Sequence, residues 1–361
     1  MMQLLLDAER ALAELGSFKQ PVFNMQLFVN MYVRKETVVS SQIEGSQATL
    51  MNVLEYENVT PGALQGRLFD GEIDQPPVPG EYIVEGINYV KAMNHGLERL
   101  RDLPLSLRLI RDIHRILMSG ARGEQRQPGQ FRTHQCHIGA PGSTIEQATY
   151  VPPPPNEALK CIGELEKFFH QDVPLPALIK AGLIHCQFEM IHPFADGNGR
   201  IGRLLIPFYL HQQGLLEQPL LYISHFFKHH RREYYDRLRA VSGSGDWEGW
   251  LAFFLSGVAS IAKDAAYTAR KASGLYREHR EIAQAVRSEY ATGLLEYLCR
   301  SPVITARDVE QQLGITYPTA NSLIRKFEHA GILTETTGKK RNRRYQYEAY
   351  VALFTEGTEP L

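Results

Sequence analysis

The stretch that decides the fold lies just past the middle of the chain, and we call it the glycine-rich loop: His192-Pro193-Phe194-Ala195-Asp196-Gly197-Asn198-Gly199-Arg200-Ile201-Gly202-Arg203. Pro193 disfavours helical backbone in the residue before it, so the preceding helix is predicted to end at His192. Gly197 and Gly199 permit positive φ angles and a close approach of the backbone to a ligand. A new helix is predicted to begin near Arg200, and its first N–H groups have no intrahelical partner.

The side chains of the glycine-rich loop indicate nucleotide-phosphate chemistry. A glycine-rich turn that leads into a helix N-terminus favours an anion, because N–H groups and the positive end of the helix dipole face it. Arg200 and Arg203 lie on one face of the predicted helix and add charge that suits phosphate. Asp196 offers a carboxylate of the kind that Mg²⁺ takes together with phosphate oxygens, and His192 is a candidate base. The alternative is an ordinary exposed turn between two helices.

The glycine-rich loop resembles the signature of the Fic family, His-Pro-Phe-x-Asp/Glu-Gly-Asn-Gly-Arg-x-x-Arg, and matches it at every specified position. The flanking Gln187-Phe188-Glu189-x-Ile191 and the upstream Tyr150-Val151-Pro152-Pro153-Pro154 also resemble this family. The resemblance covers about residues 25–290. It implies a mainly α fold, in which a helical Fic core carries a small β-hairpin flap and is followed by a C-terminal winged helix-turn-helix domain.

The resemblance also implies a role for each position of the loop. His192 would accept the proton of a target hydroxyl, and Asp196 would hold Mg²⁺ between the phosphates of ATP. The Asn198 side chain would hold the α- and β-phosphates, and Arg200 and Arg203 would pair with phosphate charge on the leaving group. The other nucleotide-binding positions that it implies are Gly197, Gly199, Ile201, Gly202 and, one helix later, Tyr235.

Residues 120–155 are irregular and rich in Gly, Pro, Thr and Gln, which in a compact domain is more often functional than not. A short hairpin is predicted to pair residues 136–138 with residues 149–151. By resemblance it would be a flap that clamps the backbone of a target protein as an added strand. The predicted flap residues are Cys136, His137, Ile138 and Gly139. The alternative is a flexible loop.

The sequence Ser40-Ser41-Gln42-Ile43-Glu44-Gly45 matches the inhibitory signature of the family, Ser/Thr-x-x-x-Glu-Gly/Asn. Ser40 and Glu44 are four residues apart and share a face of a predicted inhibitory helix over about residues 35–50. The resemblance implies that Glu44 pairs with Arg203 in the place of the γ-phosphate; the alternative is a solvated helix carboxylate. Residues 1–90 hold 5 Lys and Arg against 12 Asp and Glu, which fits a segment docked on a cationic site.

The sequence also predicts where the aromatic side chains of Phe194, His185 and Tyr235 lie. Phe194 is expected to point into the core, and His185 is expected to be a core histidine with its hydrogen bonds satisfied. Tyr235 lies in a region that by resemblance lines the pocket for the nucleotide base, and the alternative is a core aromatic.

The composition excludes several classes of protein. The chain has 361 residues and a formal net charge of -1, so it is not a polycation that coats nucleic acid or anionic lipid. Its four cysteines are far apart, which favours reduced thiols over a disulfide framework. The first residues lack the basic region of a signal peptide, and the longest apolar stretch, residues 250–262, is too short for a bilayer. A cytoplasmic protein without a membrane segment is expected.

Most of the chain has the apolar spacing of helices, for example residues 27–57, with a break near Gly45, and residues 229–241. The predicted units are an N-terminal helical region (1–100), a catalytic core (101–290) and a winged helix (291–361). The last unit shows a capped helix start at Thr305, a helix over 317–330 and strands over 332–335 and 344–347, the order of a winged helix.

If the winged helix binds DNA, the recognition helix over residues 317–328 and the wing over residues 339–344 are predicted to make the contacts. Asn321, Arg325 and Lys326 are available on the helix, and five of the six residues 339–344 are basic. The functional interpretation is binding to DNA phosphates. The alternative is a small domain used for packing, dimerisation or partner binding.

The main hypothesis from the sequence is a protein adenylyltransferase that uses ATP and Mg²⁺ to modify Ser, Thr or Tyr hydroxyls of target proteins and of itself, and that Glu44 inhibits. One alternative is a DNA-binding regulator in which the Fic core acts as a sensor. Another is transfer of UMP, phosphate or phosphocholine, or removal of AMP; Gly199, where a lysine would stand in another branch, favours AMP transfer. The family resemblance also suggests a homodimer.

Overall fold

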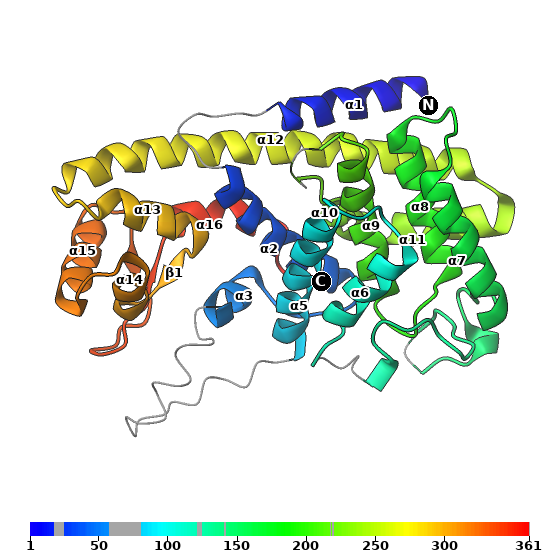
Figure 1. The fold of residues 1–361 in the computed structure, drawn as a ribbon, viewed down its shortest axis with the longest axis horizontal. Coiled ribbons are helices and arrows are strands. Elements are labelled where there is room, and N and C mark those ends of the chain that lie inside the picture. The colour runs from blue at the N-terminus through cyan, green and yellow to red at the C-terminus, as the bar shows by residue number, and fades with distance from the viewer. Residues whose placement is uncertain are drawn as a thin grey trace.

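The computed structural model describes residues 1–17, 25–57, 81–120, 125–140, 142–216, 218 and 220–360. In this part of the chain the fold is mainly α-helical, with one small antiparallel sheet near the C-terminal end (Figure 1). The mainly α class predicted from the sequence is confirmed. Within the described residues, no helix is both long enough and apolar enough to cross a membrane.

The helices before the glycine-rich loop follow the predicted order. They are α1 (Met2–Gly16), α2 (Met25–Ile43), α3 (Leu50–Glu57), α5 (Glu81–Arg99), α6 (Leu107–Leu117), α7 (Pro155–His170) and α8 (Ala177–Ile191), with a short 3-10 turn, η2 (Ile145–Gln147), between α6 and α7. The predicted break separates α2 from α3, where Gly45 has a φ of 94°. α8 ends one residue before His192, as Pro193 predicts.

The second half of the chain contains a short helix, over Ser224–His229, that the sequence did not predict. The elements after the loop are α9 (Asn198–Gln212), α10 (Ser224–His229), α11 (Arg231–Ser244), α12 (Trp247–Ala285), α13 (Ala291–Arg300), β1 (Val303–Ile304), α14 (Ala306–Leu313), α15 (Tyr317–His329), β2 (Thr334–Glu335), β3 (Tyr345–Gln346) and α16 (Glu348–Thr355). The helix predicted over residues 229–241 is α11, which begins two residues later because the chain turns at His230, with φ −105° and ψ 34°. The preceding turn is fixed by packing, because Phe227 of α10 is buried and stacks on Tyr234 of α11 at 4.3 Å.

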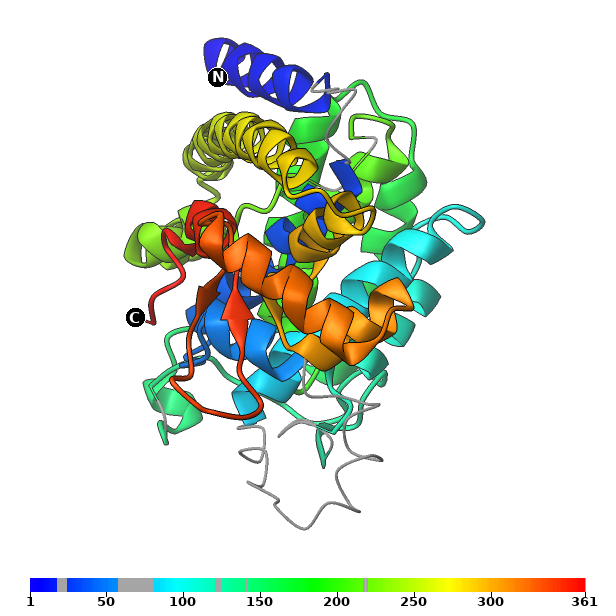
Figure 2. The same ribbon diagram turned by 90° about the vertical axis from the view of Figure 1, so that its left-hand side faces the viewer.

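α12 is 39 residues long, and helices from both the N-terminal and the C-terminal parts of the chain pack against it (Figure 1). Its buried alanines are Ala262, Ala265, Ala266, Ala269, Ala272 and Ala283. Small side chains at intervals of three or four let other helices approach closely. α1 packs along α12 and buries Leu5, Ala8, Leu12 and Leu15 at the same spacing. In Figure 2, α1 lies on one side of α12 and the rest of the molecule lies on the other.

α8 and α9 pack against each other at the centre of the core. α8 buries Leu178, Ile184 and Phe188 and has no polar face, which is typical of a helix enclosed by other helices. α9 buries Leu204 and Phe208 in the same way. Both ends of the glycine-rich loop are therefore held by the core.

The C-terminal sheet has the strand order β1-β3-β2, and Gln346 of β3 lies opposite both Val303 and Thr334. β2 and β3 fall inside the two predicted strands but are shorter. α14 has the predicted cap, since the Thr305 N–H donates to Asp308 Oδ2 at 2.7 Å and the Asp308 N–H donates to Thr305 Oγ1 at 3.3 Å. β1 and α16 were not predicted, because β1 has only two residues and its partner strand is some 40 positions away.

The C-terminal elements pack directly on α2. The Tyr350 hydroxyl donates to the carbonyl oxygen of Leu27 at 3.4 Å, and the rings of Phe354 and Phe28 lie 5.6 Å apart. Past the end of α16, the carbonyl oxygen of Thr358 accepts a hydrogen bond from Gln42 Nε2 at 2.8 Å. The helix that carries residues 40–43 is thus joined to the far end of the chain.

The packing of α5 on α9 can be tested with two glycines. A Cβ on Gly96 would collide with the ring of Phe208, whereas a Cβ on Gly163 of α7 would meet no other atom. Gly96→Ala should lower the free energy of unfolding by about 1–3 kcal/mol because the core must shift. Gly163→Ala should raise it by roughly 0.5–1 kcal/mol. Urea unfolding measures both values, and equal stabilisation by the two variants would contradict the close approach of α5 and α9.

Candidate functional site

The glycine-rich loop turns sharply between α8 and α9. His192 ends α8 in the left-handed region, with φ 50° and ψ 60°, which a non-glycine residue rarely adopts. Gly197 precedes α9 with φ 76°. α9 begins at Asn198, two residues earlier than predicted, so the first N–H groups of this helix belong to Asn198, Gly199 and Arg200.

The Asn198 side chain makes two hydrogen bonds to the backbone of the glycine-rich loop. Its Oδ1 accepts a hydrogen bond from the Phe194 N–H, and its Nδ2 donates to the Phe194 carbonyl oxygen, both at 2.8 Å. The side chain is only 2 % exposed. Because Nδ2 carries two N–H groups and only one is used here, the predicted contact of this side chain with the α- and β-phosphates stays a prediction. The backbone N–H of Asn198 is a second candidate for binding phosphate.

His114 of α6 packs against the glycine-rich loop and is hydrogen-bonded to its backbone, a role that the sequence did not predict. Its ring stacks on the buried Phe194 with centroids 3.8 Å apart. Nδ1 accepts the Gly129 N–H at 2.8 Å, so Nε2 carries the proton and donates to the Asp196 carbonyl oxygen at 3.0 Å. Burial lowers the pKa of His114 to about 4, which keeps the ring neutral. The available signal was a histidine on the apolar face of a predicted helix.

Arg132 also supports the loop and was also missed. Its guanidinium donates to the carbonyl oxygens of His192 at 2.8 Å, His134 at 3.2 Å and Pro153 at 2.5 Å. Its own N–H donates to the carbonyl oxygen of Pro193 at 2.9 Å. This buried arginine therefore ties the start of the loop to the irregular segment that was predicted to contain the flap.

The ring of His192 is oriented as a base would need to be. Nδ1 lies 3.3 Å from the carbonyl oxygen of Glu189, and since a carbonyl only accepts, Nδ1 carries the proton. Nε2 then has a free lone pair. Burial lowers the pKa of His192 to about 4, so the ring is neutral at physiological pH.

Arg203 joins α9 to the end of α2, as predicted. Its side chain is 1 % exposed, and Nη2 donates to Glu44 Oε1 at 2.8 Å. Nε donates to Ser40 Oγ at 2.8 Å, and Nη2 also donates to the Ser40 carbonyl oxygen at 2.9 Å. The spacing of Ser40 and Glu44 thus places both residues on one guanidinium.

The Glu44 carboxylate lies over the first turn of α9. A Cβ added to Gly199 would collide with Glu44 Oε1, so only glycine leaves room for this carboxylate. The position is favourable for a negative charge, because it faces the N-terminus of a helix. Burial raises the pKa of Glu44, but the positive charge and hydrogen bond of Arg203 lower it by a larger amount. The pKa of Glu44 is therefore below its ordinary value.

Arg200 points to a different partner from Arg203. Nη1 lies 3.6 Å from Glu85 Oε2 and Nη2 lies 3.6 Å from Asp196 Oδ1. The Arg200 side chain is 5 % exposed, whereas that of Asp196 is 46 % exposed. Asp196 therefore faces solvent, whereas Arg200 is buried.

Two residues that were predicted to bind nucleotide, Ile201 and Gly202, pack inside the protein core. The Ile201 side chain is buried, and its N–H donates to the Gly197 carbonyl oxygen at 3.0 Å. A Cβ on Gly202 would collide with Glu189 Oε1, a buried atom that has no hydrogen-bond partner in the described chain. Burial raises the pKa of Glu189 to about 8, so this carboxyl is protonated at neutral pH. Both positions are closely packed in this structure, and the implied contacts of Ile201 and Gly202 with nucleotide stay predictions.

A cavity of about 450 Å³ has no residue of the glycine-rich loop in its lining, but it is joined to the loop through Glu44, which pairs with Arg203. Its lining includes Glu44, Tyr235, Met190, Ile138 and Gly139. The Ile138 N–H donates to the Tyr150 carbonyl oxygen at 2.8 Å, so the predicted hairpin exists as a single bridge rather than as two strands. The structure therefore brings part of the predicted flap, the predicted base-pocket tyrosine and Glu44 to one cavity.

The other two predicted flap residues do not line this cavity. His137 Nε2 lies 2.8 Å from the Ser143 carbonyl oxygen, inside the irregular segment. Cys136 is partly buried, and this burial raises the pKa of its thiol, so it is not an activated nucleophile. His185 is a core histidine as predicted, because its two ring nitrogens lie 2.9 Å from the Gly202 carbonyl oxygen and 3.0 Å from the Tyr234 hydroxyl.

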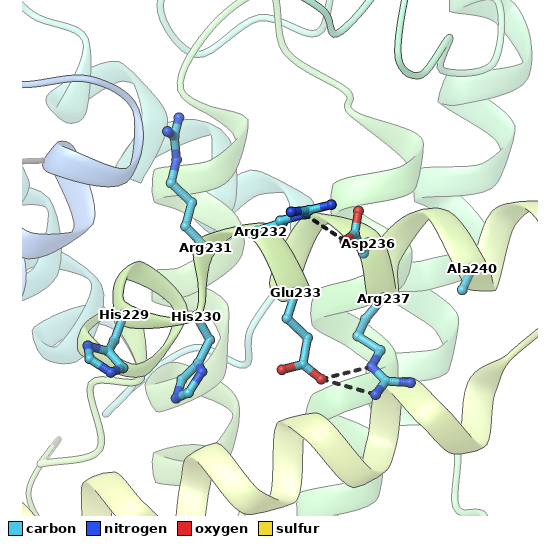
Figure 3. A pocket seen from close by; sticks show the side chains of 8 residues that line it. All are labelled: His229, His230, Arg231, Arg232, Glu233, Asp236, Arg237 and Ala240. Atoms are coloured by element: carbon cyan, nitrogen blue, oxygen red, sulfur yellow. Dashed lines mark hydrogen bonds and ion pairs between the residues drawn. The ribbon is translucent and has the colours of Figure 1, made fainter.

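A separate shallow hollow of about 580 Å³ lies beside α11 and is lined by none of the loop residues. Figure 3 shows Arg231 leaving the helix on a different side from Glu233 and Arg237. Glu233 pairs with Arg237 at 3.0 Å, and Arg232 lies 3.9 Å from Asp236. Because these charges pair with one another, we assign this hollow no part in the chemistry.

The ion pair of Glu44 with Arg203 predicts a pH dependence of stability. A carboxyl whose pKa is lowered on folding contributes stability above its ordinary pKa, and this contribution is lost as the pH falls through the folded-state value. Glu44→Gln should lower the free energy of unfolding by up to about 1 kcal/mol at pH 7, a modest value because water partly screens the carboxylate. The difference from the unmodified protein should close below pH 4.5, the ordinary value of this carboxyl.

Urea unfolding at several pH values measures this difference. Glu164→Gln, which removes the exposed ion pair with Lys167, is the control and should change stability by less than about 0.5 kcal/mol. A difference for Glu44→Gln that grows on acidification would contradict the ion pair.

Two family models match the chain: the Fic/DOC family N-terminal model over residues 2–98 and the Fic/DOC family model over residues 104–210. A probable protein adenylyltransferase of Aquifex aeolicus is 26 % identical over 198 residues, which are 53 % of this chain and 52 % of that protein. The protein adenylyltransferase Fic of Aedes aegypti is 30 % identical over 166 residues, which are 45 % of this chain and 30 % of that protein. The chain thus spans about half or less of these relatives.

Solved structures share the fold. A Fic family protein from Desulfovibrio desulfuricans is 19 % identical and aligns with a TM-score of 0.57 over 96 % of this chain and 95 % of its own. A Fic domain containing signaling protein from Bacteroides thetaiotaomicron is 16 % identical and aligns with a TM-score of 0.53 over 72 % of this chain and 95 % of its own. Since the two family models together span most of residues 2–210 and include the glycine-rich loop, the chain belongs to the Fic/DOC family.

Proposed function

We propose that this protein is an adenylyltransferase that moves AMP from ATP to Ser, Thr or Tyr hydroxyls of target proteins and of itself. The observation that carries the proposal is a neutral His192, with Nε2 unprotonated, beside the first N–H groups of α9. A base and an anion site are the two groups that this transfer needs. The names of the two curated relatives support the same activity.

The chemical step would follow from this arrangement. The target hydroxyl oxygen attacks the α-phosphorus of ATP while its proton moves to Nε2 of His192. The bond from the α-phosphorus to the oxygen that bridges to the β-phosphate breaks, which leaves an AMP ester and pyrophosphate. The N–H groups of Gly199 and Arg200 would stabilise phosphate charge, and rigid positioning rather than covalent catalysis would supply most of the acceleration.

Asp196 is the residue that would hold Mg²⁺. No three metal-binding side chains come together in the described residues, so a site made of protein ligands alone does not fit. Asp196 Oδ1 accepts the Gly197 N–H at 2.6 Å, and the side chain remains half-exposed. One exposed carboxylate suits a Mg²⁺ ion held mainly by phosphates and water. When bound, this ion would neutralise phosphate charge.

Glu44 would inhibit the transfer by occupying the place of a phosphate. Its carboxylate pairs with the buried Arg203 and lies against Gly199, both of which would otherwise be open to the nucleotide. A γ-phosphate in the same place would meet a like charge and lose its arginine partner. ATP would then bind without the geometry required for in-line attack.

Self-labelling with radioactive ATP and Mg²⁺ tests the proposal. Glu44→Gly should raise self-labelling by about tenfold or more, because it frees Arg203 for the nucleotide. His192→Ala in the same background should remove the labelling while nucleotide binding persists, because only the base is lost. Glu55→Gly, an exposed substitution on α3, should leave labelling at the level of the unmodified protein.

Each alternative gives a different result in this assay. Labelling that survives His192→Ala would contradict the role of the base, and equal labelling of Glu44→Gly and the unmodified protein would contradict inhibition. Labelled UTP, GTP and CTP offered in parallel test transfer of another nucleotide. Loss of AMP from a labelled target would instead indicate removal as the reaction.

A second candidate function is DNA binding by residues 291–361, which we propose to be a winged helix. A groove of about 540 Å³ gathers five basic side chains from α14, α15 and the turn between β2 and β3, with Asn321 and the exposed Tyr317. The basic residues are Arg307, Arg325, Lys340, Arg341 and Arg343. Clustered cations on one face are the electrostatic feature of nucleic-acid binding. Lys326 lines a different hollow, so it is not part of this groove.

A gel shift with duplex DNA at low salt tests this second function. The full-length protein should shift the duplex, and the shift should weaken as salt rises. Arg325→Glu with Arg343→Glu should abolish it, since both cations line the groove. Arg108→Glu, an exposed reversal on α6, should leave the shift intact. The absence of a shift at low salt would contradict DNA binding.

A further inference from the structure

A cleft of about 280 Å³ lies on α2 and is separate from the cavity that Glu44 lines; we call it the rear cleft. Its lining from α2 includes Tyr32, Lys35, Glu36 and Val39. The other lining residues that the argument uses are Tyr222, His225 of α10, Asp264 and Tyr267 of α12, and Glu356, which directly follows α16. The volume suits a ligand smaller than a nucleotide.

The charged groups of the rear cleft lack partners. In the described part of the chain, Lys35, Asp264 and Glu356 form no hydrogen bond or ion pair within 4 Å, although each feels the charges of the others. Partial burial and the nearby Glu356 both raise the pKa of Asp264, so the two carboxylates repel each other. Tyr222 is 4 % exposed and its hydroxyl has no hydrogen-bond partner among the described residues. The buried Tyr222 hydroxyl is a group that a ligand or water ordinarily satisfies, whereas the exposed carboxylates of Asp264 and Glu356 are open to any ligand that enters the cleft.

The charge of the side chains that line the rear cleft favours a cationic ligand. Asp264 and Glu356 carry two negative charges against the one positive charge of Lys35, and burial lowers the pKa of His225 to about 4, which leaves that ring neutral. Glu36 on the floor adds a carboxyl whose pKa burial raises to about 7, so it is partly ionised. The side chains that line the cleft thus carry a net negative charge, which disfavours an anion; Lys228 and Lys271 lie outside this lining, near His225 and Tyr267. No group of three metal-binding side chains lies close enough among the described residues to hold a metal ion.

The aromatic rings select an organic cation. Tyr32 and Tyr222 lie with ring centroids 5.5 Å apart, and Tyr267 is exposed at the rim. Lys271 Nζ lies 4.5 Å from the centroid of Tyr267 and occupies that face, so a ligand is expected against Tyr32 and Tyr222 and not against Tyr267. Carboxylates combined with tyrosine faces are the usual environment of an ammonium ligand. We propose that the rear cleft binds a small organic ammonium compound between Asp264, Glu356 and the tyrosines of its floor.

A ligand in the rear cleft would contact the helix that ends in residues 40–43. Val39 lines the cleft, and Ser40, the next residue, is bonded to Arg203. Glu356 is followed by Gly357 and Thr358, whose carbonyl oxygens accept hydrogen bonds from Lys228 and Gln42. The cleft is therefore placed to couple ligand binding to the ends of both α2 and α16. The binding itself does not depend on the proposed transferase activity.

Isothermal titration of the full-length protein, at constant ionic strength and without nucleotide, tests the proposal with three four-carbon probes. We expect saturable binding of 1,4-diaminobutane at one site per chain, and no binding of butane-1,4-diol or succinate. Asp264→Asn with Glu356→Gln should weaken diamine binding by about tenfold, because it removes two partly exposed charge contacts. Both residues are exposed, so the variant should fold normally, which its thermal unfolding will verify.

Glu348→Gln, an exposed substitution at the start of α16, is the matched control and should leave binding within twofold. Three results would overturn the proposal. They are the absence of saturable diamine binding in the millimolar range, equal binding of the neutral or anionic probe, and diamine binding that the double variant does not weaken.

Discussion

The buried guanidinium of Arg203 is the constraint on which the arrangement of the site depends. A charge this inaccessible to water must be paired and hydrogen-bonded, or the folded state loses several kcal/mol. α9 itself offers no carboxylate at that position, and the partners come from Ser40 and Glu44 at the end of α2. α2 must therefore dock against α9. The same contact that satisfies the core also places a carboxylate over the first turn of α9.

Burial controls the protonation of the histidines around the loop. His114, His185 and His192 all have lowered pKa values because their charged forms are poorly solvated. Each ring nitrogen that faces a carbonyl oxygen must carry its proton, so the backbone also selects the tautomers of His114 and His192. The neutral ring and free Nε2 of His192 thus follow from packing and from one backbone contact, without a neighbouring acid to orient it.

α2 connects several parts of the molecule. One turn before Ser40, Glu36 accepts hydrogen bonds from Tyr89 of α5 and Ser224 of α10. At its end, Gln42 donates to carbonyl oxygens of Ala48 and Thr358. A displacement of α2 would break contacts with α5, α9, α10 and the C-terminal segment together. The position of Glu44 is therefore coupled to elements far from the glycine-rich loop.

The sequence alone determined the features that depend on neighbours along the chain. Pro193 and the glycines specified the end of α8 and the turn into α9, and the four-residue spacing of Ser40 and Glu44 put both on one helix face. The resemblance to the Fic family added the pairing of Glu44 with Arg203, which the structure contains. These predictions succeed because their physical causes act over a few residues.

Only the tertiary structure decided the partners of buried polar groups. His114 and Arg132 lie about 80 and 60 positions before the loop atoms that they bind, and no short pattern reports such a distance. The sequence likewise cannot show that the Asn198 side chain makes two hydrogen bonds with the backbone of Phe194. α10, β1 and α16 were missed for the same reason, since each is short and is stabilised by segments distant in sequence. A buried polar group takes whichever partner the packing brings near, and that choice exists only in the folded chain.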